Sequence, residues 1–190
     1  MLLLEQSQGN TGVAGLWQFD FRDGEVVDPS DQFTGGGGSD EIRAGEGNDT
    51  IFGLAGEDVL YGNQDDDVIY GNQDYDILFG GRGNDTLYGG QDGDILVGGV
   101  QNDVFYGNQG PDTMFGQGGA DVFFIGPDID LIPDFNPALD RVDVLDDIGL
   151  PEKFNLLRPT LDGDTFVFYK GGGVILQGLA FEDATIDIFL

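Results

Sequence analysis

The most regular feature of the chain is a nine-residue pattern of polar and apolar positions that runs from Gly35 to Phe124. Glycine is frequent in the first half of each unit, where it permits tight turns with positive φ, and the second half is extended. The eighth position is always a large apolar residue, through ten units without an insertion or deletion. The pattern predicts one short strand per unit with one inward side chain, namely Ile42, Ile51, Leu60, Ile69, Leu78, Leu87, Leu96, Phe105, Met114 and Phe123.

Nine residues are too few to close a turn around a core, so two units form each turn of a flattened coil. The predicted fold class is therefore all-β, a parallel β-roll over residues 35–124 with about five turns and two short-stranded sheets. Residues 1–34 are expected to form an N-terminal cap in which strand 16–21 packs Trp17 on the first turn. Residues 125–190 are expected to form a C-terminal β cap that contains a hairpin of strands 165–169 and 174–176.

The charge of the chain adds a constraint on this fold. Asp and Glu total 36 against 7 Lys and Arg, which gives a net charge of −29. A compact state with this charge repels itself unless cations are bound, and nucleic acid and anionic membranes are excluded as partners. No apolar run is long enough for a membrane span.

The missing residue types exclude most catalytic chemistry. The chain has no Cys and no His, so disulfides, thiolates, imidazole bases and the usual zinc sites are excluded. Ser7, Ser30 and Ser39 are the available serines, and none lies in a nucleophile motif. The sequence therefore predicts a protein that is not an enzyme and whose metal ligands are oxygen atoms, which suit calcium.

The sixth position of the pattern is aspartate in every unit. Stacked turns would bring the carboxylates of units k and k+2 together, and a divalent cation between them would remove the repulsion. The alternative is that these residues only start turns, but turn chemistry alone would accept asparagine at some of the positions. The ten residues are Asp40, Asp49, Asp58, Asp67, Asp76, Asp85, Asp94, Asp103, Asp112 and Asp121.

Together these features resemble the G-G-x-G-x-D-x-U-x repeat of the RTX (repeats-in-toxin) family of hemolysin-type calcium-binding proteins. The resemblance implies that each ion takes backbone oxygens of positions two and four plus the aspartate of one loop. The same ion also takes the backbone oxygens of positions one and three, and the aspartate, of the loop two repeats later. About eight Ca²⁺ sites follow, which would change the net charge from −29 to −13. The implied backbone ligands are Gly36, Gly38, Gly45, Gly47, Gly53, Ala55, Gly56, Gly62, Asn63, Gln64, Asp65, Gly71, Asn72, Gln73, Asp74, Gly80, Gly81, Arg82, Gly83, Gly89, Gly90, Gln91, Asp92, Gly98, Gly99, Val100, Gln101, Gly107, Gln109, Gly116 and Gly118.

Departures from the repeat predict unequal sites. Leu54 stands at position two, where a left-handed backbone suits Gly, Asn or Asp better. Extra carboxylates at Asp65, Asp66, Asp74 and Asp92 are expected to strengthen the neighbouring sites. Outside the ten units, Asp31 and Asp130 keep the register and are candidates for one further site each, with solvated turn carboxylates as the alternative.

The ninth position is aromatic in eight of ten repeats and is expected to point outward. The row Phe52, Tyr70, Tyr88, Tyr106 and Phe124 is uninterrupted. Four roles are open: contact with the caps, self-association, stacking on sugar rings of an extracellular polysaccharide, or cross-strand ladders that stabilise each sheet.

The C-terminal residues Asp187-Ile188-Phe189-Leu190 resemble the uncleaved secretion signal of RTX proteins, and no cleaved signal peptide is expected at the N-terminus. The resemblance implies export through a type I secretion apparatus. The predicted function is a secreted, extracellular calcium-binding module that folds on binding calcium after export. The alternative is a calcium-dependent accessory module that binds polysaccharide.

Overall fold

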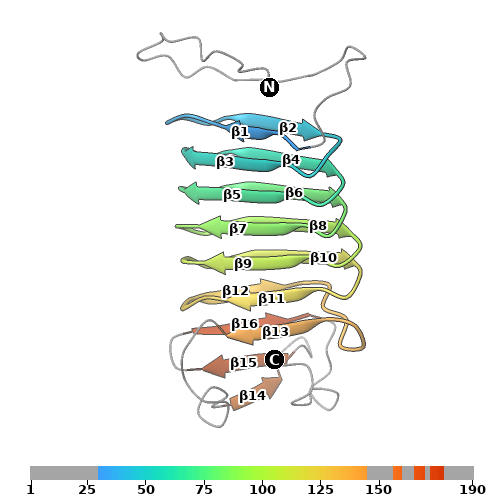
Figure 1. The fold of residues 1–190 in the computed structure, drawn as a ribbon. Helices are drawn as coiled ribbons and strands as arrows, with labels where there is room; N and C mark the ends of the chain where they lie inside the picture. The colour runs from blue at the N-terminus through green and yellow to red at the C-terminus, as the bar shows by residue number, and fades with distance from the viewer. Residues whose placement is uncertain (1–29, 145–155, 160–164, 170–171, 178–190) are drawn as a thin grey trace.

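The computed structural model describes residues 30–144, 156–159, 165–169 and 172–177, and every regular element within them is a β-strand (Figure 1). These residues accordingly contain no helix with the length and hydrophobicity to cross a membrane. The predicted strand 16–21 with Trp17 and the terminal segment 187–190 lie outside the described residues.

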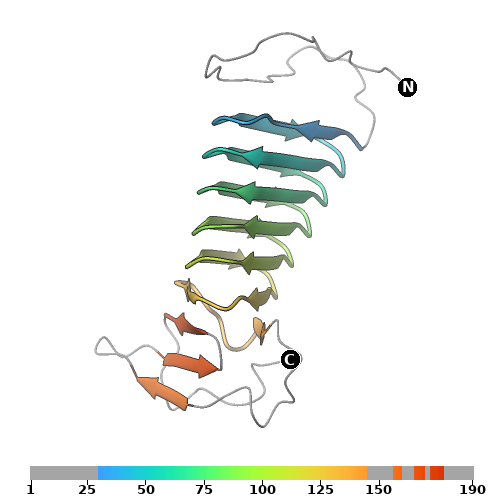
Figure 2. The same ribbon diagram turned by 90° about the vertical axis from the view of Figure 1, so that its left-hand side faces the viewer.

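Two sheets form the roll. The seven-stranded sheet has the order β1 (Gln32–Thr34), β3 (Thr50–Ala55), β5 (Val68–Gln73), β7 (Thr86–Gly90), β9 (Val104–Asn108), β11 (Val122–Ile125) and β13 (Arg141–Val144). The nine-stranded sheet has the order β14 (Leu156–Pro159), β15 (Thr165–Tyr169), β16 (Gly172–Leu176), β12 (Ile129–Ile132), β10 (Thr113–Gly118), β8 (Ile95–Val100), β6 (Ile77–Arg82), β4 (Val59–Gln64) and β2 (Glu41–Gly45). From β1 to β13 the chain alternates between the sheets, so strands that are two apart in the sequence pair with each other (Figures 1 and 2).

The pairing confirms the all-β parallel roll. From β2 to β10 each strand pairs in parallel with the strand 18 residues later, as Ile42 does with Leu60. The ten apolar residues of position eight form the core, and each is at most 1% exposed. The strands of odd-numbered repeats lie in the nine-stranded sheet and those of even-numbered repeats lie in the seven-stranded sheet, as predicted.

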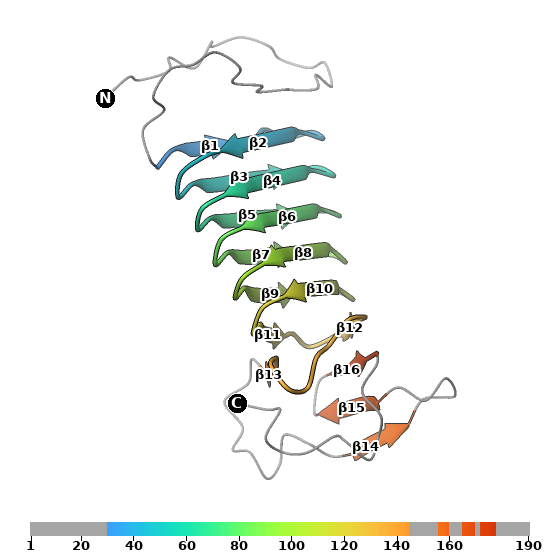
Figure 3. The same cartoon turned by 90° about the vertical axis from the view of Figure 1, so that its right-hand side faces the viewer.

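The roll continues beyond the ten repeats and makes about six turns, one more than expected. Strand β1 extends one sheet at its N-terminal end, and β12 and β13 extend both sheets at the C-terminal end. Strands β15 and β16 form the expected antiparallel pair, and β16 joins β12 in parallel (Figure 3).

The turns require left-handed backbone at positions two and four. Gly45 and Gly81 adopt φ values of +119° and +118°, and Leu54 adopts +85° at the same position although its side chain disfavours it. Asn63 and Asn72 are accommodated there because each side-chain amide donates a hydrogen bond to the carbonyl oxygen two residues earlier, at 3.4 and 3.2 Å.

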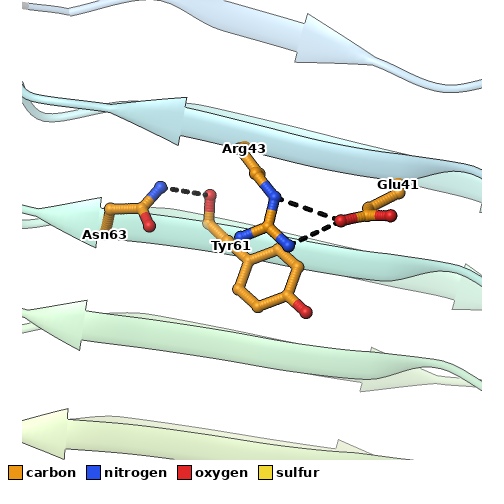
Figure 4. A network of polar contacts seen from close by, with 4 residues as sticks. All are labelled: Glu41, Arg43, Tyr61 and Asn63. Atoms are coloured by element: carbon orange, nitrogen blue, oxygen red, sulfur yellow. Dashed lines mark hydrogen bonds and ion pairs between the residues drawn. The ribbon is translucent and has the colours of Figure 1, made fainter. Parts of the chain in front are cut away.

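The outward aromatic residues stack on one another. In the row from Phe52 to Phe124, adjacent ring centroids are 4.5–4.9 Å apart and the planes differ by at most 8°. On the other sheet Tyr61 stacks on Phe79, and Arg43 lies over the Tyr61 ring while its guanidinium pairs with Glu41 at 2.6 Å (Figure 4). The rings therefore form cross-strand ladders, one of the four roles that the sequence allows.

Candidate metal centre

The position-six aspartates lie in two columns, one along each edge of the roll. All ten are buried, with at most 4% of each residue exposed. From Asp49 to Asp130, the Oδ1 atom of each column member accepts a hydrogen bond from the backbone N–H of the aspartate 18 residues earlier, at 2.8–3.0 Å. One carboxylate oxygen of each residue is therefore used to link successive turns.

The second carboxylate oxygen has no such role in the central turns. Among the described residues, eight buried Oδ2 atoms have no hydrogen-bond partner. Leaving buried acceptors unpaired is costly, and native proteins rarely do so without a bound group. These atoms belong to Asp49, Asp58, Asp67, Asp76, Asp85, Asp94, Asp103 and Asp112.

Backbone oxygens converge on the same points. A Cβ atom built on Gly53 would overlap Asp58 Oδ2 and would lie 2.8 Å from the carbonyl oxygen of Gly71 in the next turn. The same holds at Gly62, where Asp67 Oδ2 and the Gly80 carbonyl meet. Position one is thus glycine because a carboxylate oxygen and a carbonyl oxygen fill the space of a side chain.

This donor set fits a calcium ion. At Gly53, Gly62, Gly71 and Gly89 a carboxylate oxygen meets a carbonyl oxygen of the next turn, and hard oxygen donors are what calcium prefers. The described residues contain no cluster of three or more His, Cys, Asp or Glu side chains able to hold a metal alone. Backbone carbonyls would therefore have to complete the coordination.

The other implied ligands lie in the same stacked loops, but several carbonyl oxygens are engaged. The carbonyl oxygens of Asn72 and Gly90 accept hydrogen bonds from the N–H groups of Gln91 and Gln109, at 2.8 and 3.0 Å. That of Gly36 accepts a longer one, 3.4 Å, from Ala55. Each could reach an ion only through its second lone pair.

The extra carboxylates at position four face the neighbouring turn. Asp65 Oδ2 accepts a hydrogen bond from the Gly47 N–H, and Asp74 Oδ2 accepts one from the Gly56 N–H, both at 3.1 Å. Both carboxylates thus link loops directly, in addition to adding negative charge near the columns.

The end loops are closed in a different way. Asp40 Oδ2 accepts a hydrogen bond from the Gly36 N–H at 2.6 Å, and Asp130 Oδ2 accepts one from the Gly126 N–H at 3.3 Å. Each bond joins an aspartate to its own loop, as in a turn carboxylate. Asp31 is partly buried and contributes its backbone N–H to Asp49.

One further column member, Asp140, was missed by the sequence analysis. It is 3% exposed, and its Oδ1 atom accepts the Asp121 N–H at 3.1 Å across 19 residues. Its Oδ2 atom accepts the Asn136 N–H at 2.7 Å, so it closes the last loop. A search that allowed one inserted residue would have found it, because Val142 stands two positions after it as the inward residue does in each repeat.

Burial makes the columns poor places for negative charge. Desolvation raises the pKa of Asp67, Asp76, Asp103 and Asp112 from 3.8 to about 8, against the opposing effect of the backbone hydrogen bonds. Neighbouring carboxylates of the same column raise these pKa values further. The folded chain without a cation therefore favours protonated aspartates at neutral pH.

Acid is accordingly expected to replace part of the calcium requirement. Because the pKa of these groups is higher in the folded than in the unfolded chain, the folded chain binds more protons between about pH 4 and pH 8. Its calcium-free stability therefore falls as the pH rises through this range. We expect protein freed of calcium by dialysis to show more β structure by circular dichroism at pH 4.5 than at pH 8; equal spectra, or more structure at pH 8, would contradict this.

The nine-residue repeat matches a known protein family. The family model of the RTX calcium-binding nonapeptide repeat (4 copies) matches overlapping segments that together cover residues 30–132, more than half of the chain. No curated protein sequence matches the chain.

Two solved structures also align with the chain. The extracellular lipase LipA from Serratia marcescens is 14% identical with a TM-score of 0.40, and the alignment covers 86% of this chain but only 38% of the lipase. The AlgE6R3 subunit of the Azotobacter vinelandii mannuronan C5-epimerase is 21% identical with a TM-score of 0.36, covering 96% of this chain and 86% of that one. On the match of the repeat model to residues 30–132, the chain belongs to the RTX calcium-binding nonapeptide repeat family.

Proposed function

We propose that the chain is a secreted, extracellular calcium-binding module that folds when calcium fills the spaces between successive turns. The observation that carries the proposal is the set of eight buried Oδ2 atoms without a partner. Each is part of a carboxylate that a bound divalent cation would neutralise, and together they account for a substantial part of the net charge of −29. Binding energy at such sites is folding energy, because the unfolded chain does not bring the turns together.

The expected ion count is about eight, as the pairing of ten repeats also predicts. The unpartnered oxygens begin at Asp49 and end at Asp112, one repeat later than the pairing that starts at Asp40. Equilibrium dialysis of the purified protein against calcium tests this count. A count near zero in folded protein would contradict the proposal.

Two aspartate variants sharpen this experiment. Asp76→Ala removes an unpartnered oxygen and one link between turns, so we expect fewer bound ions and a higher calcium concentration for half-folding. Asp40→Ala removes a carboxylate whose Oδ2 is already bonded to Gly36, so we expect the ion count to stay unchanged. Equal losses in the two variants would contradict the assignment of ions to the central turns.

We further propose export through a type I secretion apparatus, on the resemblance of Asp187-Ile188-Phe189-Leu190 to the RTX secretion signal. Extracellular calcium modules bind calcium at about 0.1–1 mM, so such a module folds after export because the calcium concentration is higher outside the cell. Deleting the four residues should retain the protein in the cell and leave calcium-induced folding of purified material nearly unchanged. Normal export with impaired folding would instead mean that the segment belongs to the cap.

A polysaccharide-binding role has less support than the calcium module. Sugar stacking needs exposed ring faces, whereas the rings from Phe52 to Phe124 cover one another's faces at centroid distances of 4.5–4.9 Å. We likewise propose that the chain is not an enzyme, because it has neither His nor Cys to serve as base or nucleophile.

A further inference from the structure

The two edges of the roll carry the same column of aspartates but differ at position five. The first edge consists of loops 46–49, 64–67, 82–85, 100–103 and 118–121, which lead from the nine-stranded to the seven-stranded sheet. Within the ten repeats, the second edge consists of loops 37–40, 55–58, 73–76, 91–94 and 109–112, which lead from the seven-stranded to the nine-stranded sheet.

The first edge has a continuous side-chain ladder at position five. Asn48 Oδ1 accepts the backbone N–H of Asp66 at 3.2 Å, and Asp66 Oδ1 accepts that of Asn84 at 2.6 Å. Asn84 Oδ1 accepts the N–H of Asn102 at 3.2 Å, and Asn102 Oδ1 accepts that of Ala120 at 2.8 Å. The Asn84 side-chain amide adds a bond to Asp66 Oδ1 at 3.0 Å. These bonds join five successive loops without using a position-six carboxylate.

The second edge lacks this ladder. Its position-five residues are Ser39, Glu57, Tyr75, Gly93 and Pro111. Glycine and proline have no side-chain acceptor, and proline also has no backbone N–H to donate. Apart from the position-six carboxylates, the side-chain links between described loops of this edge lie at position four, where Asp74 Oδ2 accepts the Gly56 N–H at 3.1 Å and Asp128 Oδ2 accepts the Gly110 N–H at 2.9 Å. The spacing of these loops therefore depends more heavily on the proposed calcium ions between their aspartates.

We propose that the position-five ladder holds the loops of the first edge in register, so that calcium fills the first edge at lower concentration than the second. The inference rests on the proposed calcium-dependent function and adds an order of binding to it. The aspartates of both edges use Oδ1 in the same way, so the difference does not come from the carboxylates. When calcium brings the turns together, the ladder bonds form on the first edge and add to the free energy of binding there, whereas no such bonds form on the second edge.

Hydrogen exchange followed by mass spectrometry over a calcium series tests the order of binding. Amides in loops 82–85 and 100–103 should gain protection at lower calcium than amides in loops 73–76 and 91–94. We expect midpoints that differ by about fivefold, the factor by which one net hydrogen bond changes an equilibrium constant. Coinciding midpoints, or earlier protection of the second edge, would overturn the inference and leave the proposed function standing. If no loop responds to calcium, the proposed function fails and the inference fails with it.

Variants at position five separate this effect from general stability. Asn84→Ala removes the bonds to Asn102 and Asp66, and should raise the midpoint of the first edge alone by about fivefold. Tyr75→Ala is the matched change on the second edge, where no ladder bond exists, and should alter neither midpoint. Asp66→Asn keeps the Oδ1 acceptor and should preserve the order of the edges. An equal shift of both edges in Asn84→Ala would overturn the inference.

The reverse experiment adds a rung where the fold has none. In Tyr75→Asn, the new side-chain oxygen would face the position-five N–H of Gly93 in the next turn of the second edge. We expect the second-edge midpoint to fall toward that of the first edge. An unchanged second-edge midpoint would contradict the role of the ladder.

Discussion

Removal of calcium at neutral pH is expected to convert the roll into a largely disordered chain. Eight buried carboxylates would then have to be ionised without a cation or protonated against solvent pH, in a chain of net charge −29. Chelation should abolish the β-sheet signal in far-ultraviolet circular dichroism, and calcium at about 0.1–1 mM should restore it cooperatively.

Magnesium provides the matched control for this experiment. It demands a small octahedral shell and loses its water reluctantly, so it is a poor substitute between loops that offer carbonyl oxygens. We expect magnesium at the same concentration to leave the chelated chain disordered. An unchanged spectrum on chelation would contradict calcium-dependent folding, and full recovery with magnesium would contradict calcium selectivity.

Adding one methyl group at position one of a central repeat should have the second largest effect. A Cβ atom on Gly71 would overlap Asp76 Oδ2 and would lie 2.6 Å from the carbonyl oxygen of Gly89. Overpacking of this kind costs about 1–3 kcal/mol, or roughly five- to 150-fold in a folding equilibrium. Gly71→Ala should therefore lower the folding equilibrium constant at a fixed calcium concentration by about this factor, and raise the calcium concentration for half-folding.

Gly37→Ala is the control for the added methyl group. A Cβ atom on Gly37 would have no other heavy atom within 4 Å beyond its chain neighbours, so we expect an unchanged midpoint. The natural exception at position one is Ala44, and Ala44→Gly should lower the midpoint if the methyl group there also crowds its site. Equal midpoints for Gly71→Ala and Gly37→Ala would show that the space at position one is not part of the site.

The sequence was sufficient to predict the fold because the repeat length fixes the geometry. Nine residues per unit place Ile42 beside Leu60 and Asp58 beside Asp76, whatever the other residues are. The all-β roll, its two sheets and its ten core residues follow from this spacing. Local deviations such as left-handed Leu54 do not change the spacing, since stacked neighbours impose the backbone on them.

Features that depend on local backbone direction could not be predicted in this way. Asp40 and Asp58 occupy the same position of the repeat, yet only Asp40 has its second oxygen bonded to its own loop. Asp140 lies outside the nine-residue frame because one residue is inserted before it. The faces of the aromatic rings also look available in sequence, although the strand spacing stacks each ring on the next.

The strands that follow β12 also bear on assembly. A coil with a constant 18-residue turn exposes at its end an unpaired strand with the same register as the strands before it. A second molecule could pair with this strand and continue the coil as a fibre. Here the last turn spans 19 residues between Asp121 and Asp140, and antiparallel β15 and β16 follow β12 in the other sheet. In the nine-stranded sheet an incoming copy would therefore not meet the free edge of a repeat strand, because β16, β15 and β14 cover β12. We expect this covering to disfavour continuation of that sheet by a second molecule.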